Sequence, residues 1–569
     1  MRIQKVQISK FRSIENGSFH IDDVVAIVGQ NNSGKTAVLR ALNSFFNPQV
    51  ELQNFISGVN IYSTNRAVPR ITISFNTVPN KTVYTPFLNN GELRIKQEFN
   101  KTRNRLEYSV FNNGTFENAS DNLISELRED VQFILIPTDR TSSFYKNNES
   151  SILRELLNLF FSNHTAKRNT LTPKVKDAFD YLTKNALNKV AKGIEGRYLT
   201  NKGFDFKIGT NIPISYELFL NDLEIRINED GKEFNLKDCG SGIQSLVAIA
   251  IYRYLAELKH NNFIIGLEEP ETNLHPQGQK ELIYTLFEQV QNNNIQVLFT
   301  THSPVLVDQL DHTKIILIRK ISDNQRIFKS KILQLRNDFW IHYNLQRLQY
   351  DKFHKFRNSE FFYANHVLVT ESPIDSSIFS TLLDNKGIKI ERKGISVLQL
   401  DGIASLKYAF YILRDLEIPK TMIIDKDFFF NYQNGDKANS SYTSGFFNYQ
   451  NVFKNEQLIN EIFTNVNERQ QIEGLLTTNH SRALDFTVKY DVVCMKFNLE
   501  MDLVASTTAQ NLIYNHLNVP LADRNTNEIL VNREKALKKM DLLLYVINNL
   551  AHMNLPNSYK RLVKRIKEL

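Results

Sequence analysis

Cysteine and tryptophan are nearly absent from this 569-residue chain, which contains two cysteines and one tryptophan. Cys239 and Cys494 cannot build a framework of several disulfides, and by themselves they cannot supply a zinc site. A reducing cytoplasm is therefore the expected compartment. Long apolar runs are also lacking, since none approaches the roughly 18 residues that a membrane span needs. The segment "MRIQKVQISKFRSI" is charged and has no apolar core, so we expect no export signal.

The remaining composition is that of a folded chain with 42% hydrophobic and 23% charged residues. A chain of this length exceeds a single hydrophobic core, so we expect about two to four domains. The net charge of +8 permits contact with a polyanion such as DNA. Ordinary solvated lysines explain the same excess equally well, so the charge alone does not identify a partner.

Alternating apolar segments, turn residues and helical stretches divide the chain into α/β regions. The expected fold is a first α/β domain with a helical insert, then a second α/β domain and a helical C-terminal part. The boundaries that we predict are 1–149 and 198–325 for the first α/β domain, 150–197 for the helical insert, 326–360 for a linker, 361–450 for the second α/β domain and 451–569 for the helical part.

A phosphate-binding loop is indicated by "VVAIVGQNNSGKTAVLRAL", an apolar strand followed by a glycine-bounded loop and an amphipathic helix. Its residues match the pattern G-x-x-x-x-G-K-S/T in full. Backbone N–H groups of such a loop surround phosphates, and the helix N-terminus adds partial positive charge. Lys35 would neutralise the β- and γ-phosphates, and the Thr36 hydroxyl would coordinate Mg²⁺. The loop residues that we assign to nucleotide are Gly29, Asn32, Ser33, Gly34, Lys35 and Thr36.

Three further segments complete the expected nucleotide site. The strand in "FIIGLEEPETNLHP" carries Glu268 and Glu269 to its carboxyl end, where α/β sheets place ligands. Glu268 is the expected Mg²⁺ ligand through water, and Glu269 is expected to polarise the attacking water. The strand in "VLFTTHSP" ends at His302, a candidate contact to the γ-phosphate. The segment "CGSGIQSLVAIAIYRYL" contributes Ser241, Gly242 and Gln244 at the start of an apolar helix.

Taken in this order, the four elements resemble the ABC-type ATPase heads of the SMC and RecF kind. The resemblance implies that "GSGIQS" is the signature loop, which meets the nucleotide held by a second head. The chain departs from the usual pattern at Ile243, where a second glycine is common, and at Glu268, where aspartate is usual. These departures concern the rate of hydrolysis more than the binding of ATP.

A second acidic site is indicated by "HVLVTESPID", "ISVLQLDGIASL" and "KTMIIDKDFFF". Glu371 follows the first strand, with Asp375 four residues later, and Asp425 and Asp427 end the third strand. An unpaired buried charge is costly, so carboxylates at strand ends need a partner, solvent or a metal. Parallel strands would gather these carboxylates at one sheet edge, and such hard oxygen ligands suit Mg²⁺ or Mn²⁺.

This second pattern resembles the TOPRIM domain of topoisomerases, primases and some nucleases. An ABC-type head followed by TOPRIM is similar to the OLD family of endonucleases, which includes the Gabija nuclease subunit and retron-associated effectors. The resemblance implies a dimerisation role for the helical insert and further catalytic groups from the C-terminal part. Glu500 and Asp502 stand where the family carries an acidic motif, and Lys535 is chosen over Lys538 and Lys539 as the catalytic lysine.

The leading hypothesis is an ATP-regulated, metal-dependent DNA endonuclease that assembles as a homodimer or a higher even-numbered oligomer. An antiphage role, with a reverse transcriptase and its DNA or a helicase as partner, is implied only by the family. The alternative is a DNA-binding sensor ATPase whose TOPRIM domain is a scaffold, and the acidic cluster argues against it. Topoisomerase activity lacks an identifiable nucleophilic tyrosine among 22. Primase activity normally needs a template-binding module, and two cysteines cannot build a zinc one.

Overall fold

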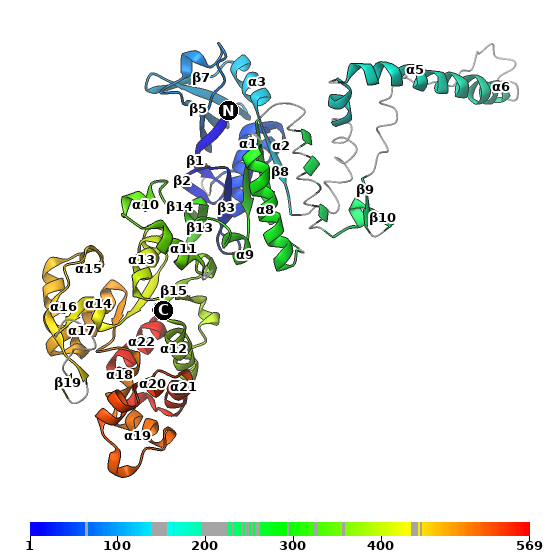
Figure 1. The fold of residues 1–569 in the computed structure, drawn as a ribbon. Coiled ribbons are helices and arrows are strands. Elements are labelled where there is room, and N and C mark those ends of the chain that lie inside the picture. The colour runs from blue at the N-terminus through cyan, green and yellow to red at the C-terminus, as the bar shows by residue number, and fades with distance from the viewer. Residues whose placement is uncertain are drawn as a thin grey trace. The chain divides into compact units, whose positions relative to one another are not determined.

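The computed structural model has two compact units (Figure 1). One comprises Met1–Ile27, Gly34–Gln309 and Ile321–Lys331, and the other comprises Val28–Ser33, Leu310–Lys320 and Ile332–Leu569. The residues that the structure describes are 1–62, 67–138, 156–162, 164–194, 225–229, 231–240, 243–244, 247, 250–251, 254–255, 262–272, 274–292, 295–322, 328–355, 359–433, 442–443 and 446–569.

A twelve-stranded sheet runs in the order β7-β6-β5-β4-β1-β2-β14-β13-β3-β12-β11-β8. Its β4-β5-β6-β7 and β1-β2 pairings are antiparallel, whereas β3, β12, β11 and β8 are parallel. The parallel strands are mostly apolar because helices cover such sheets on both faces. The strands are β1 (Arg2–Phe11), β2 (Ile14–His20), β3 (Val24–Val28), β4 (Arg70–Asn76), β5 (Leu93–Asn100), β6 (Arg105–Asn112), β7 (Thr115–Asn118), β8 (Val131–Ile136), β11 (Asn262–Glu268), β12 (Ile295–Thr300), β13 (Ile315–Ser322) and β14 (Phe328–Gln334).

Helices of the first unit include α1, whose apolar side chains are buried beside β8 and β12. The predicted helical insert is helical where it is described, with a π-helical turn at Thr183–Leu187 between two α-helices. The helices are α1 (Lys35–Phe46), α2 (Pro48–Ile56), α3 (Asp121–Asp130), α5 (Thr165–Leu182), α6 (Asn188–Ile194), α8 (Pro276–Asn292) and α9 (Pro304–Val307), and a hairpin is formed by β9 (Arg226–Glu229) and β10 (Lys232–Asn235).

The second unit is built on a four-stranded parallel sheet in the order β16-β15-β17-β22. Strands β15 (His366–Thr370), β16 (Ile395–Gln399) and β17 (Lys420–Ile424) match the three segments that the sequence indicates. The fourth, β22 (Val492–Cys494), comes from the part predicted to be helical, because three apolar residues carry no strand periodicity of their own. Two small hairpins are β18 (Phe430–Tyr432) with β21 (Tyr449–Phe453) and β19 (Tyr442–Thr443) with β20 (Phe446–Phe447).

Helices surround this sheet and share one apolar core with it, in which α12 packs against α21 and α22 against β22. Those from the C-terminal part are orange to red in Figure 1. The helices are α10 (Phe339–His342), α11 (Arg347–Lys355), α12 (Pro373–Asn385), α13 (Leu406–Asp415), α14 (Lys426–Phe429), α15 (Gln457–Ile462), α16 (Val466–Thr478), α17 (His480–Thr487), α18 (Leu499–Val504), α19 (Thr507–His516), α20 (Glu534–Leu537), α21 (Met540–Asn549) and α22 (Asn557–Glu568). Across the described residues, a helix with the length and apolar character to cross a membrane is not found.

Candidate functional site

The predicted phosphate-binding loop follows β3, whose five residues are all buried, and leads into α1. Three of its residues have backbone angles in the left-handed region, with φ of 145° at Gly29, 56° at Asn32 and 105° at Gly34. A side chain at Gly34 would place its Cβ 2.7 Å from the Ser13 Oγ and still closer to the Ser330 hydroxyl. Position 34 therefore favours glycine, because a side chain would be strained at this φ and would displace the two serine hydroxyls.

Lys35 is buried, with 6% of its surface exposed, whereas Thr36 beside it is exposed on the first turn of α1. Burial lowers the pKa of Lys35 to about 8, and the nearby charges of Glu269 and Glu271 oppose that shift. A partly desolvated ammonium at a helix start is stabilised by an anion, so the geometry suits a phosphate.

Glu268 ends β11 in a buried position, and burial raises its pKa. One of its carboxylate oxygens lies 3.8 Å from Arg40 Nε, and the other accepts a hydrogen bond of 3.4 Å from the Thr138 N–H. The carboxylate is thus held by neighbouring groups of the first unit, and its predicted role toward Mg²⁺ through water stays a prediction.

Glu269 and His302 lie together, with 3.7 Å between a Glu269 carboxylate oxygen and His302 Nε2. The φ of 43° at Glu269 is unusual for a residue with a side chain, and such angles cluster at functional sites. Glu271 was not anticipated from the sequence: its carboxylate accepts the His302 N–H at 2.8 Å and, with Glu269, counteracts the desolvation of Lys35. Only its place in "EEPETNLHP" hinted at this role.

The predicted signature loop is described in part. Ser241 and Gly242 lie outside the described residues. Gln244 is fully buried, and its amide nitrogen donates a hydrogen bond of 2.8 Å to the Cys239 carbonyl oxygen. The contact of Gln244 with a nucleotide therefore stays a prediction that this geometry does not itself support.

The acidic residues of the second unit follow strand ends, as the sequence predicts. Glu371 comes directly after β15 and Asp425 directly after β17, and these two strands are paired in parallel register. Burial, together with the charges of Asp427, Asp375 and Glu500, raises the pKa of Glu371 to about 7. Burial and the same neighbours, with Glu371 among them, raise the pKa of Asp425 well above its ordinary value. Five carboxylates therefore repel one another at this edge of the sheet.

Asp375 has a second, structural role in this cluster. One of its carboxylate oxygens accepts the Ser372 N–H at 3.0 Å, and Ser372 Oγ accepts the Asp375 N–H at 3.2 Å, which forms a capping box at the start of α12. Burial raises the pKa of Asp375 to about 6 against these hydrogen bonds. Glu500 is half-buried on α18, and its charge raises the pKa values of Glu371, Asp375 and Asp425.

Asp502 and Lys535, the other two residues predicted from the C-terminal part, lie in different surroundings. Asp502 is buried, and its two oxygens accept hydrogen bonds from the N–H groups of Lys496 and Phe497 and from the Ser558 hydroxyl. Because both oxygens are engaged, this geometry favours a structural role for Asp502 over metal binding. Lys535 is exposed on the four-residue helix α20, and no contact among the described residues places it at the carboxylates, so its catalytic role stays a prediction.

The donor set fits a hard divalent cation in its chemistry. Clustered, partly desolvated carboxylates are destabilised by mutual repulsion, and a cation relieves that repulsion. Within the described part of the chain, however, no three His, Cys, Asp or Glu side chains converge into closed metal-binding geometry. The carboxylates are therefore gathered but not arranged as a finished coordination shell.

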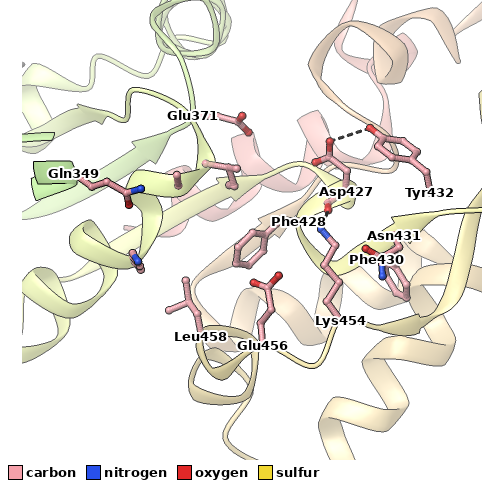
Figure 2. A pocket seen from close by; sticks show the side chains of 13 residues that line it. Gln349, Glu371, Asp427, Phe428, Phe430, Asn431, Tyr432, Lys454, Glu456 and Leu458 are labelled. Atoms are coloured by element: carbon pink, nitrogen blue, oxygen red, sulfur yellow. Dashed lines mark hydrogen bonds between the residues drawn. The ribbon is translucent and has the colours of Figure 1, made fainter. Parts of the chain in front are cut away.

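A cleft of about 690 Å³ opens beside two of these carboxylates (Figure 2). Glu371 and Asp427 both line it, and so do Lys407 from α13 and Lys454, which follows β21. Lys407 is half-buried, its Nζ lies 5.4 Å from the centre of the Tyr408 ring, and it forms no ion pair with any described residue. The cleft thus combines acidic groups that suit a metal with a lysine whose charge is available to an anion.

Two residues of the cleft were missed by the sequence analysis. The Tyr432 hydroxyl donates a hydrogen bond of 2.9 Å to Asp427 Oδ2, and Lys454 Nζ donates one of 2.5 Å to the Asp427 carbonyl oxygen. Both bonds are drawn in Figure 2. Neither residue belongs to a recognisable motif, because their partner Asp427 lies 5 positions from Tyr432 and 27 positions from Lys454 along the chain.

Comparison with known families agrees with these two sites. The family model "AAA domain, putative AbiEii toxin, Type IV TA system" matches residues 24–308, which is half of the chain. The chain belongs to this AAA family. C-terminal to the AAA domain, the model "Overcoming lysogenization defect protein-like, TOPRIM domain" matches residues 362–427. This range includes Glu371, Asp375, Asp425 and Asp427. The predicted α/β fold class, an ATPase head followed by TOPRIM, is confirmed.

Relatives extend the similarity beyond the two domains. The Old nuclease of Escherichia phage P2 is 24% identical over 478 residues, covering 76% of this chain and 78% of the relative. The OLD nuclease of Thermus scotoductus is 24% identical over 454 residues, covering 75% and 82%. Endonuclease GajA of Bacillus cereus strain VD045 is 27% identical over 239 residues, covering 41% and 39%. The resemblance to the OLD family that the motifs indicate is thereby confirmed.

Among solved structures, the SMC head domain from Thermotoga maritima matches with a TM-score of 0.32 and 17% identity, covering 59% of this chain and 100% of that chain.

Proposed function

We propose that this protein is a DNA endonuclease that depends on a divalent metal and is regulated by ATP bound to its AAA domain. The observation that carries the proposal is the crowding of carboxylates around Asp425 at the carboxyl edge of the TOPRIM sheet. A purely structural sheet edge gains nothing from buried, mutually repelling acids, whereas a metal site requires them. The relatives named as nucleases agree with this reaction class.

Glu371, Asp425, Asp427 and Glu500 are the residues that would hold Mg²⁺ or Mn²⁺. A bound divalent ion supplies an activated water and charge that stabilises the leaving oxygen of a phosphodiester. The chain itself contributes the position of the carboxylates, which the parallel strands fix, and a partly desolvated surrounding in which charges act strongly.

The DNA backbone is expected in the cleft beside Glu371 and Asp427. Lys407 and Lys454 line this cleft, and lysines that contact phosphates supply most of the affinity for DNA without reading its sequence. Removal of the half-buried Lys407 should therefore weaken DNA binding and reduce its salt dependence, while leaving the metal carboxylates in place.

Nicking of supercoiled plasmid tests the endonuclease assignment. Wild-type protein is incubated with Mg²⁺ or Mn²⁺, with and without ATP, beside Glu371→Ala and Asp427→Ala. Both substitutions should abolish nicking and leave binding of a fluorescent ATP analogue unchanged, since Lys35, Glu269 and His302 belong to the other compact unit. Glu391→Ala, which removes an exposed carboxylate of the same unit, is the matched control. Undiminished cleavage by both cleft variants would contradict the assignment.

ATP is proposed to act as a switch through its binding. Phosphodiester hydrolysis is downhill, so cleavage itself needs no energy from ATP. Lys35 and Thr36 would bind the phosphates and Mg²⁺, and Glu269 with His302 would face the γ-phosphate. A ligand shifts a conformational equilibrium only by its differential affinity for the two states, so occupancy is expected to matter more than turnover.

The finer assignments extend this proposal. An ABC-type head completes its nucleotide site with a second head, so we propose a homodimer or a higher even-numbered oligomer. An antiphage role, and a retron reverse transcriptase or a helicase as partner, rest on the family resemblance and the similarity to GajA. The alternative, a sensor ATPase with a non-catalytic TOPRIM scaffold, is disfavoured by the carboxylate cluster.

A further inference from the structure

The Asp427 side chain extends from a helix that is too short to fix the orientation of its carboxylate. Helix α14 has four residues, Lys426–Phe429, and follows directly on the end of β17. An aspartate χ2 angle is broadly distributed, so a carboxylate on such a turn has rotational freedom. Precise metal binding therefore requires a second element that fixes this carboxylate.

The hairpin formed by β18 and β21 supplies that element from two sides. Tyr432 on β18 donates its hydroxyl proton to Asp427 Oδ2 at 2.9 Å. Lys454, which follows β21, donates from Nζ to the Asp427 carbonyl oxygen at 2.5 Å, and its own N–H bonds to the Phe429 carbonyl oxygen. The side chain and the backbone of Asp427 are thus both tied to the hairpin.

Tyr432 is itself held firmly. Its ring stacks on that of Tyr449, with centroids 5.1 Å apart and planes at 27°, and meets Phe447 edge-on at 5.4 Å. The register of the hairpin pairs Tyr432 with Tyr449 directly. The Tyr432 hydroxyl is a donor in this arrangement, since an ionised carboxylate can only accept a hydrogen bond. A ring fixed in this way can hold a carboxylate in one orientation.

We propose that Tyr432 is a positioning residue for the metal: it holds Asp427 Oδ2 and leaves Oδ1 to the cation. Asp427 Oδ1 accepts no hydrogen bond from any other described residue. Glu371 lines the same cleft, and Asp427 Oδ1 is the Asp427 carboxylate oxygen that would be available to a cation held there. This inference rests on the proposed nuclease function and names a residue outside the acidic motif.

Tyr432→Phe tests the proposal, because it removes the hydroxyl and keeps the stacked ring. Tyr408→Phe is the matched control: Tyr408 lies in the same unit and donates a hydrogen bond of the same 2.9 Å length, but to the Gln346 carbonyl oxygen. The first readout is Mn²⁺ binding to the protein without DNA, followed by electron paramagnetic resonance. The second is the Mn²⁺ concentration that gives half-maximal plasmid nicking.

Tyr432→Phe should weaken Mn²⁺ binding and raise the half-maximal Mn²⁺ concentration by about tenfold to a hundredfold, as is usual for partners of metal ligands. Saturating Mn²⁺ should restore nicking, the KM for DNA should stay unchanged, and Tyr408→Phe should behave as wild type. Mn²⁺ binding by Tyr432→Phe within twofold of wild type would overturn the proposal. So would a defect that saturating Mn²⁺ does not repair, since that places the damage in the fold. Failure of the wild-type protein to nick plasmid with Mn²⁺ would instead contradict the proposed function.

Discussion

Replacing Glu371 by Gln should abolish nuclease activity and at the same time make the metal-free protein more stable. Glu371 is packed beside other carboxylates in a partly desolvated position, which raises its pKa to about 7 from the ordinary 4.5. Glutamine has nearly the same shape but no charge, so it removes the repulsion and keeps the packing. A gain in stability with a loss of function is typical of residues retained for activity.

The magnitude follows from the shift in pKa. A carboxyl group whose pKa is higher in the folded state destabilises the fold when it ionises, so the penalty is absent well below pH 4.5 and complete above pH 7. At about 1.4 kcal/mol per pKa unit, the shift corresponds to at most about 3 kcal/mol at pH 8. Because the repulsion is shared among several coupled carboxylates, the expected gain in the free energy of unfolding is on the order of 2 kcal/mol. Near pH 5 the difference in the free energy of unfolding between Glu371→Gln and wild type should fall below about 1 kcal/mol.

Thermal melting in EDTA at pH 8 and pH 5 provides the assay. For a unit of roughly 250 residues, each kcal/mol changes the melting temperature by about 2–4 °C. Glu371→Gln should therefore melt several degrees above wild type at pH 8, with the gap narrowing at pH 5. Adding Mn²⁺ should close or reverse the gap, because the ion stabilises the protein that binds it more tightly.

Glu391→Gln is the control for this experiment, since it neutralises an exposed carboxylate of the same unit and should leave the melting temperature unchanged. The reasoning would be refuted if Glu371→Gln were no more stable than wild type in EDTA at pH 8. Retention of plasmid nicking by Glu371→Gln would refute it equally.

Three further outcomes are expected. A non-hydrolysable ATP analogue should change nicking in the same direction as ATP, and Lys35→Ala should blunt both responses; an effect of ATP alone would make hydrolysis the signal. Light scattering should show a dimer or a larger even-numbered assembly, and a monomer at micromolar concentration with and without ATP would contradict it. Burial lowers the pKa of His312 to about 3 from 6.5, so wild type should lose stability relative to His312→Phe as pH falls below about 6.5. A constant difference in melting temperature between pH 8 and pH 5 would argue against that burial cost.

Local sequence was sufficient for the parts of this protein whose chemistry sits in one short segment. The loop from Gly29 to Thr36 could be recognised because its glycines, lysine and hydroxyl residue act within eight consecutive positions. Glu371 and Asp425 could be expected at one sheet edge because each directly follows an apolar strand, and the carboxyl ends of parallel strands meet. The order of these segments was also enough to indicate an ATPase head followed by TOPRIM, which the family models confirm.

Only the tertiary structure decided which polar groups serve these segments and which do not. Asp502 stands beside Glu500 where the family carries an acidic motif, but its two oxygens accept hydrogen bonds from the hydroxyl of Ser558, 56 positions later, and from two backbone N–H groups. Tyr432 and Lys454 both donate hydrogen bonds to Asp427, and the hairpin that carries them has no sequence motif. Hydrogen bonds between residues distant along the chain leave no periodicity or fixed spacing. They depend on how strands and helices pack, and a single sequence does not display that packing.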